Sequence, residues 1–412
     1  MTDITETITR FKAVCAELNC KPCPYINRVL EKEKLDAEEH REMEGDYKDS
    51  MHMSLAGNNH LMTNTRINDQ DVQVLYKTLY NNMYVTSIDL RYNHITDEGA
   101  KAIGKLLEET PLLRELNLMC NEIGEAGAEA IARALQINES LVFLRMNGNK
   151  IGNKGGMYFA QMLQVNMNLE QLDVGDCDLE QESVIALGTV LTQNQTLRAL
   201  NVNRPILFSH QEECTVHMAK TLKVNRTLRE IHMQKYDMRD FGATRLAENL
   251  MGNYTLRYLD LSCNRITRDG TFELAKFLKM NTPLEILDLG YNRLEDDGAI
   301  HLADALTTFN TNLQTLVICY NNISSKGLCA IADCMKFNMG LQAVYIWGNN
   351  LEEPAAIAFS GLLQTERLLP KNTDVRPYVV DGITILSQLN HHIRRHYYWK
   401  PSYGDDVPPP KT

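Results

Sequence analysis

The stretch 85–179 repeats one motif four times, as VTSIDLRYNHI (85–95), LRELNLMCNEI (113–123), LVFLRMNGNKI (141–151) and LEQLDVGDCDL (169–179). Each copy begins 28 residues after the previous one and has the form L-x-x-L-x-L-x-x-N-x-I/L, followed by a helical pattern. Asparagine holds the turn position in the first three copies, and Cys177 holds it in the fourth. A fixed internal period of this length is typical of solenoids and related repeat architectures.

The turn position recurs in both directions along the chain. In order, it is occupied by Asn58, Asn93, Asn121, Asn149, Cys177, Pro205, Tyr236, Asn264, Asn292, Asn321 and Asn349. The successive intervals are 35, 28, 28, 28, 28, 31, 28, 28, 29 and 28 residues. A period kept this closely predicts one continuous array of about eleven repeats.

The residues within one copy have clear physical roles. In LRELNL (113–118), leucines point into the core while Glu115 and Asn117 alternate outward, as a strand requires. The Asn121 amide can satisfy turn backbone groups that would otherwise be buried without partners. Gly127 lies where the loop meets the next helix, which requires either close packing or an unusual φ. The apolar residues after it recur at i, i+3, i+4 and i+7, which predicts an amphipathic helix.

The 28-residue period resembles that of the ribonuclease-inhibitor-like class of leucine-rich repeat proteins. This resemblance implies an α/β fold: a leucine-rich repeat solenoid shaped as a horseshoe, with parallel strands inside and helices outside. Stacked repeats bury the apolar faces that a single repeat would leave exposed. Proteins of this class serve as ribonuclease inhibitors, GTPase activators for Ran, actin-end caps, sensors and components of the ciliary and flagellar axoneme. The resemblance supplies no catalytic residues.

Three regions are expected along the chain. Residues 1–47 read as an N-terminal helical cap, residues 48–365 as the leucine-rich repeat solenoid, and residues 366–412 as a C-terminal hairpin followed by a basic and aromatic tail. The hairpin is predicted around Asp381-Gly382, a favoured two-residue turn. The repeats are irregular in the middle, where RPILFSHQEE (204–213) is predicted to bulge, with specificity or simple repeat decay as the two explanations.

Composition limits the classes of function. The net charge of −11 argues against a general nucleic-acid or anionic-membrane binder. No signal peptide or membrane-spanning run is evident, so we expect a cytoplasmic protein. The ten cysteines mostly occupy repeat positions and are expected to be reduced, and Cys20-Lys-Pro-Cys23 lacks a second ligand pair. We therefore expect no metal, no cofactor, no small-molecule substrate and no catalytic residues.

The candidate partner-binding residues are those whose side chains should point outward along the strands of the concave face, together with the tail. They are Asp89, Arg91, Asn117, Arg145, Asp173, Arg204, His232, Tyr258, Asp260, Tyr291, Tyr320, Tyr345, Trp347, Tyr397, Tyr398 and Trp399. The first repeats offer mixed, mostly acidic charge. At the C-terminal end Tyr291, Val317, Tyr320, Tyr345 and Trp347 are expected to converge, and clustered aromatic residues are typical of interface hot spots. Either a partner or the chain's own tail could cover them.

These features predict a non-catalytic protein-interaction scaffold that binds partners through the concave face and the C-terminal tail. A stable assembly in the cytoskeleton of the cilium or flagellum, such as the axoneme, is the favoured setting. The alternatives are an adaptor in the nucleus or nucleolus and a Ran-type GTPase-activating protein. The second alternative is disfavoured because the tail is basic, whereas such activators carry a strongly acidic one.

Overall fold

The structure is a computed structural model that describes residues 3–44, 50–59, 65–207 and 212–389. The described chain forms two compact units, which divide between Leu197 and Arg198. This division falls inside the segment that was predicted as one solenoid. Each unit is built from leucine-rich repeats, so the predicted α/β solenoid fold is confirmed.

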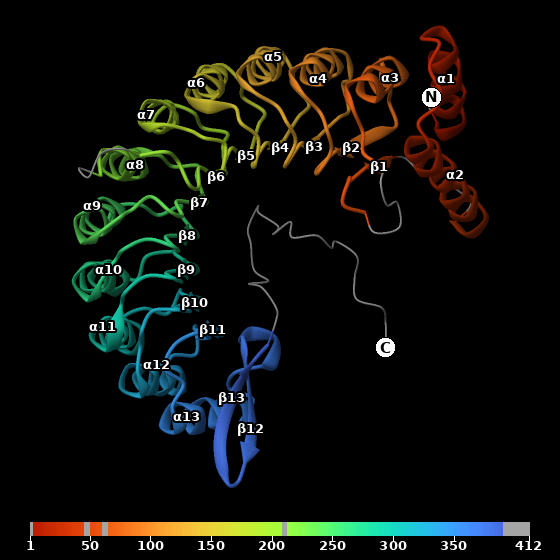
Figure 1. Ribbon diagram of the computed structural model, residues 1–412. Helices are drawn as coiled ribbons and strands as arrows, with labels where there is room; N and C mark the ends of the chain where they lie inside the picture. The colour runs from red at the N-terminus through yellow and green to blue at the C-terminus, as the bar shows by residue number, and fades with distance from the viewer. Residues whose placement is uncertain (1–2, 45–49, 60–64, 208–211, 390–412) are drawn as a thin grey trace. The chain divides into compact units, whose positions relative to one another are not determined.

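The first unit has alternating strands and helices after an N-terminal helical pair. Its elements are α1 (Ile4–Glu17), α2 (Pro24–Glu44), β1 (Met51–Ser54), α3 (Asp69–Leu79), β2 (Val85–Asp89), α4 (Asp97–Glu109), β3 (Glu115–Asn117), α5 (Glu125–Leu135), β4 (Phe143–Arg145), α6 (Gly152–Leu163), β5 (Gln171–Asp173) and α7 (Gln181–Leu191). Strands β1 to β5 pair in chain order and run parallel. Helices α3 to α7 lie on one side of this sheet (Figure 1).

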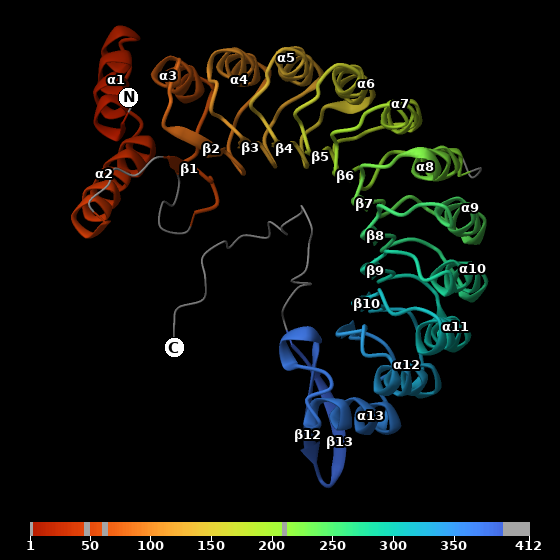
Figure 2. The ribbon, with the colours of Figure 1, turned by 180° about the vertical axis from the view of Figure 1, so that it is seen from behind.

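The second unit continues the same pattern and ends in a hairpin. Its elements are β6 (Ala199–Asn201), α8 (Glu213–Val224), β7 (Glu230–His232), α9 (Asp240–Leu250), β8 (Tyr258–Asp260), α10 (Arg268–Lys279), β9 (Ile286–Asp288), α11 (Glu295–Thr308), β10 (Thr315–Val317), α12 (Ser325–Phe337), β11 (Ala343–Tyr345), α13 (Glu353–Gln364), η1 (Pro370–Asn372), β12 (Val375–Val380) and β13 (Ile383–Gln388). Strands β6 to β11 are again parallel neighbours. Their helices lie on one side of the sheet, as the view from behind also shows (Figure 2).

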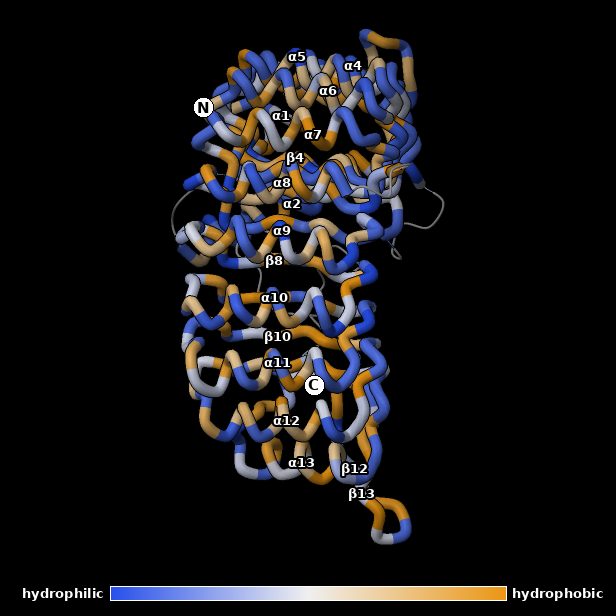
Figure 3. The backbone as a smooth tube through the Cα atoms, turned by 90° about the vertical axis from the view of Figure 1, so that its left-hand side faces the viewer, coloured by the Kyte–Doolittle hydropathy of each residue, from blue (hydrophilic) through white to orange (hydrophobic). Residues whose placement is uncertain are grey.

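The core lies between the strands and the helices of each unit. Leu116 and Leu118 are fully buried, as their inward register predicts, and so are Ile131 and Leu135 on the apolar face of α5. Both polar and apolar residues occur along each helix (Figure 3), because only one face of the helix packs on the sheet.

The repeat glycines allow close approach between neighbouring repeats. A Cβ on Gly127 would lie 2.7 Å from Asp97 Oδ1 and 2.8 Å from the Ala100 Cβ. The Gly127 N–H donates to the same Asp97 oxygen at 2.9 Å. Of the two reasons considered for this glycine, close packing is therefore the one that applies.

The N-terminal helices pack against the first repeats. Helix α1 packs on α3, and α2 packs on β1. The Tyr25 hydroxyl donates to the Ala56 carbonyl at 3.0 Å, and the Tyr84 hydroxyl donates to a Glu33 carboxylate oxygen at 2.9 Å. Burial and the Glu33 contact together raise the pKa of Tyr84. These contacts are what a cap over the first repeat requires.

The C-terminal hairpin has the predicted turn. Strands β12 and β13 are antiparallel, with Val380 opposite Ile383. Asp381 and Gly382 both have positive φ, at 51° and 83°, which is the conformation of a two-residue turn of type I′. The hairpin packs on α13.

Candidate protein-binding surfaces

Two surfaces carry the predicted partner-binding residues. The strand face is formed by the side chains that point away from the helices along β1 to β5 in the first unit and along β6 to β11 in the second. The turn rim is formed by the residue just before each turn position from Asn93 onward. In chain order the turn rim contains Tyr92, Cys120, Gly148, Asp176, Arg204, Lys235, Cys263, Tyr291, Tyr320 and Gly348.

The turn rim has one backbone conformation throughout. Every residue in it has a positive φ, from 51° at Asp176 to 81° at Gly348. This left-handed conformation is uncommon for residues other than glycine, asparagine and aspartate. It turns the chain at the end of each strand.

The turn asparagines stabilise this reversal. The Asn121 amide donates to the carbonyls of Leu90, Leu118 and Met119 at 3.0, 3.0 and 3.4 Å. Its carbonyl oxygen accepts from the Ile95 N–H at 3.2 Å. The predicted role of these asparagines is confirmed, because the buried amide satisfies backbone groups of two neighbouring repeats.

In the first unit the strand face is held by arginine–carboxylate pairs. Arg91 Nε lies 3.2 Å from Asp89 Oδ2, and Arg145 Nε lies 3.6 Å from Asp173 Oδ2. The Arg145 guanidinium also lies 5.3 Å from the centre of the Phe143 ring. All four paired side chains are buried, and burial raises the pKa of Asp89 although Arg91 opposes that shift. Asn117, the remaining predicted residue here, is buried and accepts from the Met119 N–H.

In the second unit an imidazole lies between two carboxylates. His232 Nε2 lies 2.7 Å from Glu230 Oε1, and His232 Nδ1 lies 2.9 Å from Asp260 Oδ2. Asp260 also accepts from the Ser262 hydroxyl at 2.8 Å and from the Gln234 side chain. Tyr258 packs its ring edge-to-face on His232, with ring centres 4.9 Å apart.

The electrostatics of this cluster favour a protonated histidine. Burial alone would lower the pKa of His232, but the hydrogen bonds and charges of Asp260 and Glu230 outweigh burial and raise the pKa to about 10. The same contacts lower the pKa of Asp260 against the effect of its burial. Asp288, on the next strand, has its pKa raised by burial and by the charge of Asp260.

The cluster does not have the geometry of a nucleophilic triad. Both ring nitrogens of His232 contact carboxylates, so neither is directed at a hydroxyl or thiol. With its pKa near 10, the ring is also already protonated at neutral pH, whereas a general base must be neutral. The arrangement is that of a buried ion cluster which links β7 to β8.

The predicted aromatic group at the C-terminal end forms two separate parts. Tyr291 and Tyr320 stack on the turn rim, with ring centres 4.4 Å apart and planes at 10°. They remain 53% and 41% exposed. Tyr345 instead packs with Val317 in a buried cluster and is only 4% exposed. Burial removes Tyr345 from the exposed surface, while Trp347 is half-buried.

Two residues beyond the last repeat bond to its end, and the sequence analysis did not predict this role for them. Asp374 accepts from the Ile346 and Trp347 N–H groups at 2.8 and 3.0 Å, where another repeat would otherwise supply acceptors. The Arg367 side chain donates to three carbonyls of the preceding repeat, including Met335 O at 2.6 Å. The sequence signal was weak, because each residue occurs once and follows no period.

The remaining predicted partner-binding residues lie on the turn rim and in the C-terminal tail. Arg204 is exposed on the turn rim. The structure describes its repeat up to Leu207 and again from residue 212, so only part of the predicted bulge at 204–213 is described. Tyr397, Tyr398 and Trp399 lie outside the described residues.

Glu230 and Gln234 complete the His232 cluster and were not predicted. Their spacing of two residues on either side of His232 was the available signal, since residues i and i+2 share a face of an extended segment.

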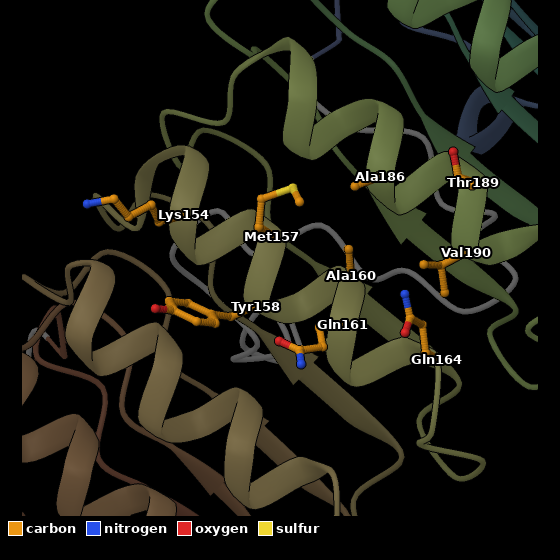
Figure 4. A pocket seen from close by; sticks show the side chains of 9 residues that line it. All are labelled: Lys154, Met157, Tyr158, Ala160, Gln161, Gln164, Ala186, Thr189 and Val190. Atoms are coloured by element: carbon orange, nitrogen blue, oxygen red, sulfur yellow. The ribbon is translucent and has the colours of Figure 1, made fainter.

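A shallow depression lies on the outer side of the first unit, between α6 and α7 (Figure 4). Its volume is about 620 Å³, and its lining is Lys154, Met157, Tyr158, Ala160, Gln161, Gln164, Ala186, Thr189 and Val190. Lys154, the charged residue of this set, pairs with Glu125 at 3.0 Å. The depression therefore offers no group of acids, bases or nucleophiles to a ligand.

The part of the chain that the structure describes holds no cluster of three metal-binding side chains. Within the same residues, no helix is long and apolar enough to cross a membrane.

All ten cysteines are described and are free thiols. Asn194 and Asn253, which begin N-x-T sequences, are buried and donate to carbonyls of the preceding repeat, so both serve as structural positions of the repeat.

Comparisons with known proteins agree with this architecture. The family described as "Leucine Rich repeat" matches residues 81–104, 111–132, 138–160, 165–188, 252–275, 281–303 and 309–332. Leucine-rich repeat-containing protein 34 of Mus musculus is 52% identical over 396 residues, which cover 96% of this chain and 94% of that protein. The proteins of the same name from Rattus norvegicus and Homo sapiens are 46% and 49% identical over 213 and 208 residues. These two alignments cover 52% and 50% of this chain and 51% and 45% of those proteins.

A solved structure is also similar, but only weakly. The chain titled leiomodin-1 actin-binding site 2 aligns with a TM-score of 0.32 and 19% identity, over 35% of this chain and 82% of that one. A similarity this low carries no argument about function.

Proposed function

Because the chain belongs to the family of leucine-rich repeat-containing protein 34, we propose that it is a non-catalytic scaffold which holds protein partners on its strand face, turn rim and C-terminal tail. Leucine-rich repeats mediate protein–protein interactions, and this coarser role follows from the family. The finer proposal is that the protein is a lasting component of a cytoplasmic assembly, with the ciliary or flagellar axoneme favoured over the nucleus or nucleolus.

The observation that carries this proposal is the stacked pair of Tyr291 and Tyr320. Both rings are largely exposed, although two adjacent aromatic side chains would ordinarily be covered. Both also occupy positive φ, at 57° and 53°, where a bulky side chain is disfavoured. The stack offers a rigid, flat, amphipathic surface, and clustered tyrosines of this kind are typical anchors of protein interfaces.

Two further observations support a scaffold. The strand face of each unit is organised by buried ion pairs that hold the side chains in place, which lowers the entropy lost on binding. The His232 cluster, the most concentrated group of acids and bases on that face, does not have the geometry of a general base or nucleophile.

Cross-linking mass spectrometry on the endogenous protein, isolated with its complexes from ciliated and germ-line cells, tests the proposal. Lys235 lies on the turn rim and is exposed, so it reports contacts there. We expect Lys235 to cross-link to axonemal or microtubule-associated proteins. Cross-links confined to this chain, together with transient nuclear partners, would contradict a stable axonemal role and favour the nuclear adaptor.

Variants then test the anchor itself. Replacing Tyr291 and Tyr320 together by Ser should reduce retention of the cross-linked partner at least ten-fold, because anchor aromatics contribute about 2 kcal/mol each. A matched control replaces Phe309 and Phe337 by Ser, since these side chains are 47% and 72% exposed on helix ends away from the turn rim. Equal retention of the partner by both double variants would show that Tyr291 and Tyr320 do not anchor it. A GTP hydrolysis assay with Ran tests the enzymatic alternative separately.

A further inference from the structure

The C-terminal hairpin of the second unit presents an apolar surface that the scaffold proposal does not use. The antiparallel pairing of β12 and β13 puts Tyr378 opposite Ile385 and Val380 opposite Ile383. Residues i and i+2 of a strand share a face, so these four side chains lie on one face of the hairpin. We refer to them as the hairpin face. Tyr378, Val380 and Ile383 are 45%, 45% and 49% exposed, and Ile385 is half-buried.

The opposite face of the hairpin is covered at its base by the last repeat. Val375 and Leu386, which lie on that opposite face, are buried, and the hairpin packs on α13. This support does not reach the turn, because Val379 on the same face is 67% exposed. The hairpin extends beyond α13, and its end carries apolar residues (Figure 3). Since a two-stranded hairpin is only marginally stable alone, an uncovered apolar face on it indicates a surface for a partner.

The edges of the hairpin are poorly suited to the addition of a strand. The Leu389 N–H donates to the Asp374 carbonyl at 2.7 Å, so these residues form a hydrogen-bonded pair. Such pairs alternate with non-hydrogen-bonded pairs, which places the nitrogen of Pro377 at the outer edge of β12, where proline cannot donate to an added strand. Strand β13 lies on the side of α13 in two opposite views (Figures 1 and 2). The hairpin face is therefore the surface left for a partner.

Two charges of opposite sign lie at the two ends of the hairpin face. Arg376 lies on the same side of β12 as Tyr378, at the base of the hairpin, and Asp381 lies in the turn. Both side chains are exposed, and neither forms an ion pair with any residue in the described part of the chain. They are five residues apart in the chain, which corresponds to about 17 Å of extended strand.

We propose that the hairpin face binds the hairpin face of a second copy of this chain. In a two-fold dimer both copies use the same patch, so two antiparallel hairpins place the base of one over the turn of the other. Arg376 of one copy then meets the partner's Asp381, while the apolar side chains of the two faces cover each other. The order of cation, apolar residues and anion is complementary to its own reversal. This self-complementarity favours a second copy over an unrelated protein.

The dimer is expected to be weak and reversible. The hairpin face consists of four side chains, and small interfaces are typical of transient association, so we expect a dissociation constant on the order of 10 µM. A dimer presents two copies of the Tyr291–Tyr320 stack, which raises the avidity for a partner with repeated binding sites. Dimerisation itself does not depend on the proposed scaffold contacts, because the hairpin face shares no residue with the strand face or the turn rim.

Sedimentation velocity on the full-length chain tests the proposal, and we expect a shift from monomer to dimer between about 1 and 100 µM. The test variant is Val380→Thr, and the matched control is Val379→Thr, the same change on the adjacent residue of the opposite face. Threonine keeps the branched side chain that strands favour, so both hairpins should form. Because each lost contact counts twice in a two-fold dimer, Val380→Thr should weaken dimerisation about five-fold or more. Val379→Thr should leave it within about two-fold of the wild type.

A charge variant tests the antiparallel arrangement of the two hairpins. Arg376→Glu places like charges together and should weaken the dimer about three-fold or more. Adding Asp381→Asn to Arg376→Glu removes that repulsion and should recover most of the loss. Asparagine is suited to this test because it tolerates the positive φ of 51° at this turn position. Failure of the second substitution to recover dimerisation would overturn the pairing of Arg376 with the partner's Asp381.

Three outcomes would overturn the proposed dimer. A wild-type chain that stays monomeric at about 100 µM has no such interface. Equal weakening by Val380→Thr and Val379→Thr would remove the distinction between the two faces, and a dimer that neither variant changes would use another surface. Cross-linking mass spectrometry then identifies a different occupant. In a monomeric chain, a cross-link between Lys371 at the base of the hairpin and Lys400 would assign the hairpin face to the C-terminal tail of the same chain.

Discussion

The regular repeats around Asn121 and Asn264 and the irregular repeats around Cys177 and Tyr236 make the same turn with different side chains. Asn121 donates to three carbonyls, whereas the Cys177 thiol donates to one, Met146 O at 3.2 Å. The buried Tyr236 hydroxyl has no hydrogen-bond partner among the described residues. Yet the residue before each of these four positions has φ between 51° and 57°.

The comparison shows that the turn does not depend on asparagine alone. The residue before the turn position is held by its neighbour: the Cys120 N–H donates to Asn147 O at 2.8 Å, and the Arg204 N–H donates to Gln234 O at 2.9 Å. Stacking of repeats therefore fixes the backbone, and the asparagine adds stability by satisfying buried groups. The irregular repeats keep the shape and lose part of that stabilisation.

The largest effect is expected from removing a turn asparagine. Asn264→Ala removes donors to Met233 O, Leu261 O and Ser262 O and an acceptor for two backbone N–H groups. Because these groups stay buried, we expect a loss of about 3 kcal/mol in the free energy of unfolding. Urea unfolding followed by circular dichroism measures it. A loss below about 1 kcal/mol would mean that stacking alone stabilises the turn.

The next effect concerns pH and the irregular repeat that contains His232. Its pKa is raised from 6.5 to about 10 in the folded state, so the folded protein binds the proton more tightly than the unfolded chain. The resulting stabilisation is complete below pH 6.5 and is lost as pH rises through 10.

Urea unfolding at pH 6, 8 and 10 tests this sign. The difference in stability between the wild type and His232→Gln should shrink as pH rises, since the wild type loses its extra proton. In the first unit, Arg145 keeps its charge over this range, and Arg145→Gln should show no such pH dependence. A His232 difference that grows with pH would contradict the buried imidazolium.

An intermediate effect is expected at the glycine that follows a regular turn. A Cβ on Gly270 would lie 2.6 Å from Asp240 Oδ1, so Gly270→Ala should cost about 2 kcal/mol through overpacking. The irregular repeat has Ser183 at the equivalent position, where the hydroxyl bonds to Glu180 O at 3.0 Å. Gly361→Ala is the control, because a Cβ there meets nothing within 4 Å and should stabilise α13 slightly. Thermal melts that rank the two variants the other way would remove close packing as the reason for this glycine.

The smallest effect is expected at the turn cysteine. Cys177→Ala removes one weak hydrogen bond and a small buried volume, so we expect a loss of about 1 kcal/mol. Burial raises the pKa of Cys177 well above its usual value, and a thiol-specific reagent at pH 8 should modify it only after unfolding. Rapid labelling in the folded state would show that the irregular repeat opens more readily than its backbone suggests.

Much of the fold follows from local patterns. Alternation along 113–118 placed Leu116 in the core, and the structure agrees, because a strand has only two faces. Asn117 alternates with Leu116 as predicted, but its side chain is buried as well. The Asp381-Gly382 turn was equally predictable, since few residues tolerate two successive positive φ values. These predictions rest on backbone geometry that neighbouring residues decide.

The candidate sites were less predictable. The register of the strand columns was predicted correctly, but sequence alone did not show that most of the predicted partner-binding side chains on the strands are buried, Tyr345 among them. It also did not show that His232 lies between Glu230 and Asp260. Which side chains share a column is readable from the register, whereas their rotamers and burial depend on the neighbours across the sheet.

The repeat, its register, the strand–helix alternation and the hairpin follow from the amino-acid sequence, because periodic apolar burial and special turn residues are properties of short segments. Three features became visible only in the folded chain: the division between Leu197 and Arg198, the stacking of Tyr291 on Tyr320, and the hydrogen bonds of Asp374 to the end of the last repeat. These outcomes depend on contacts between residues far apart in the chain. Only the stacked repeats bring those residues within a few ångströms of one another.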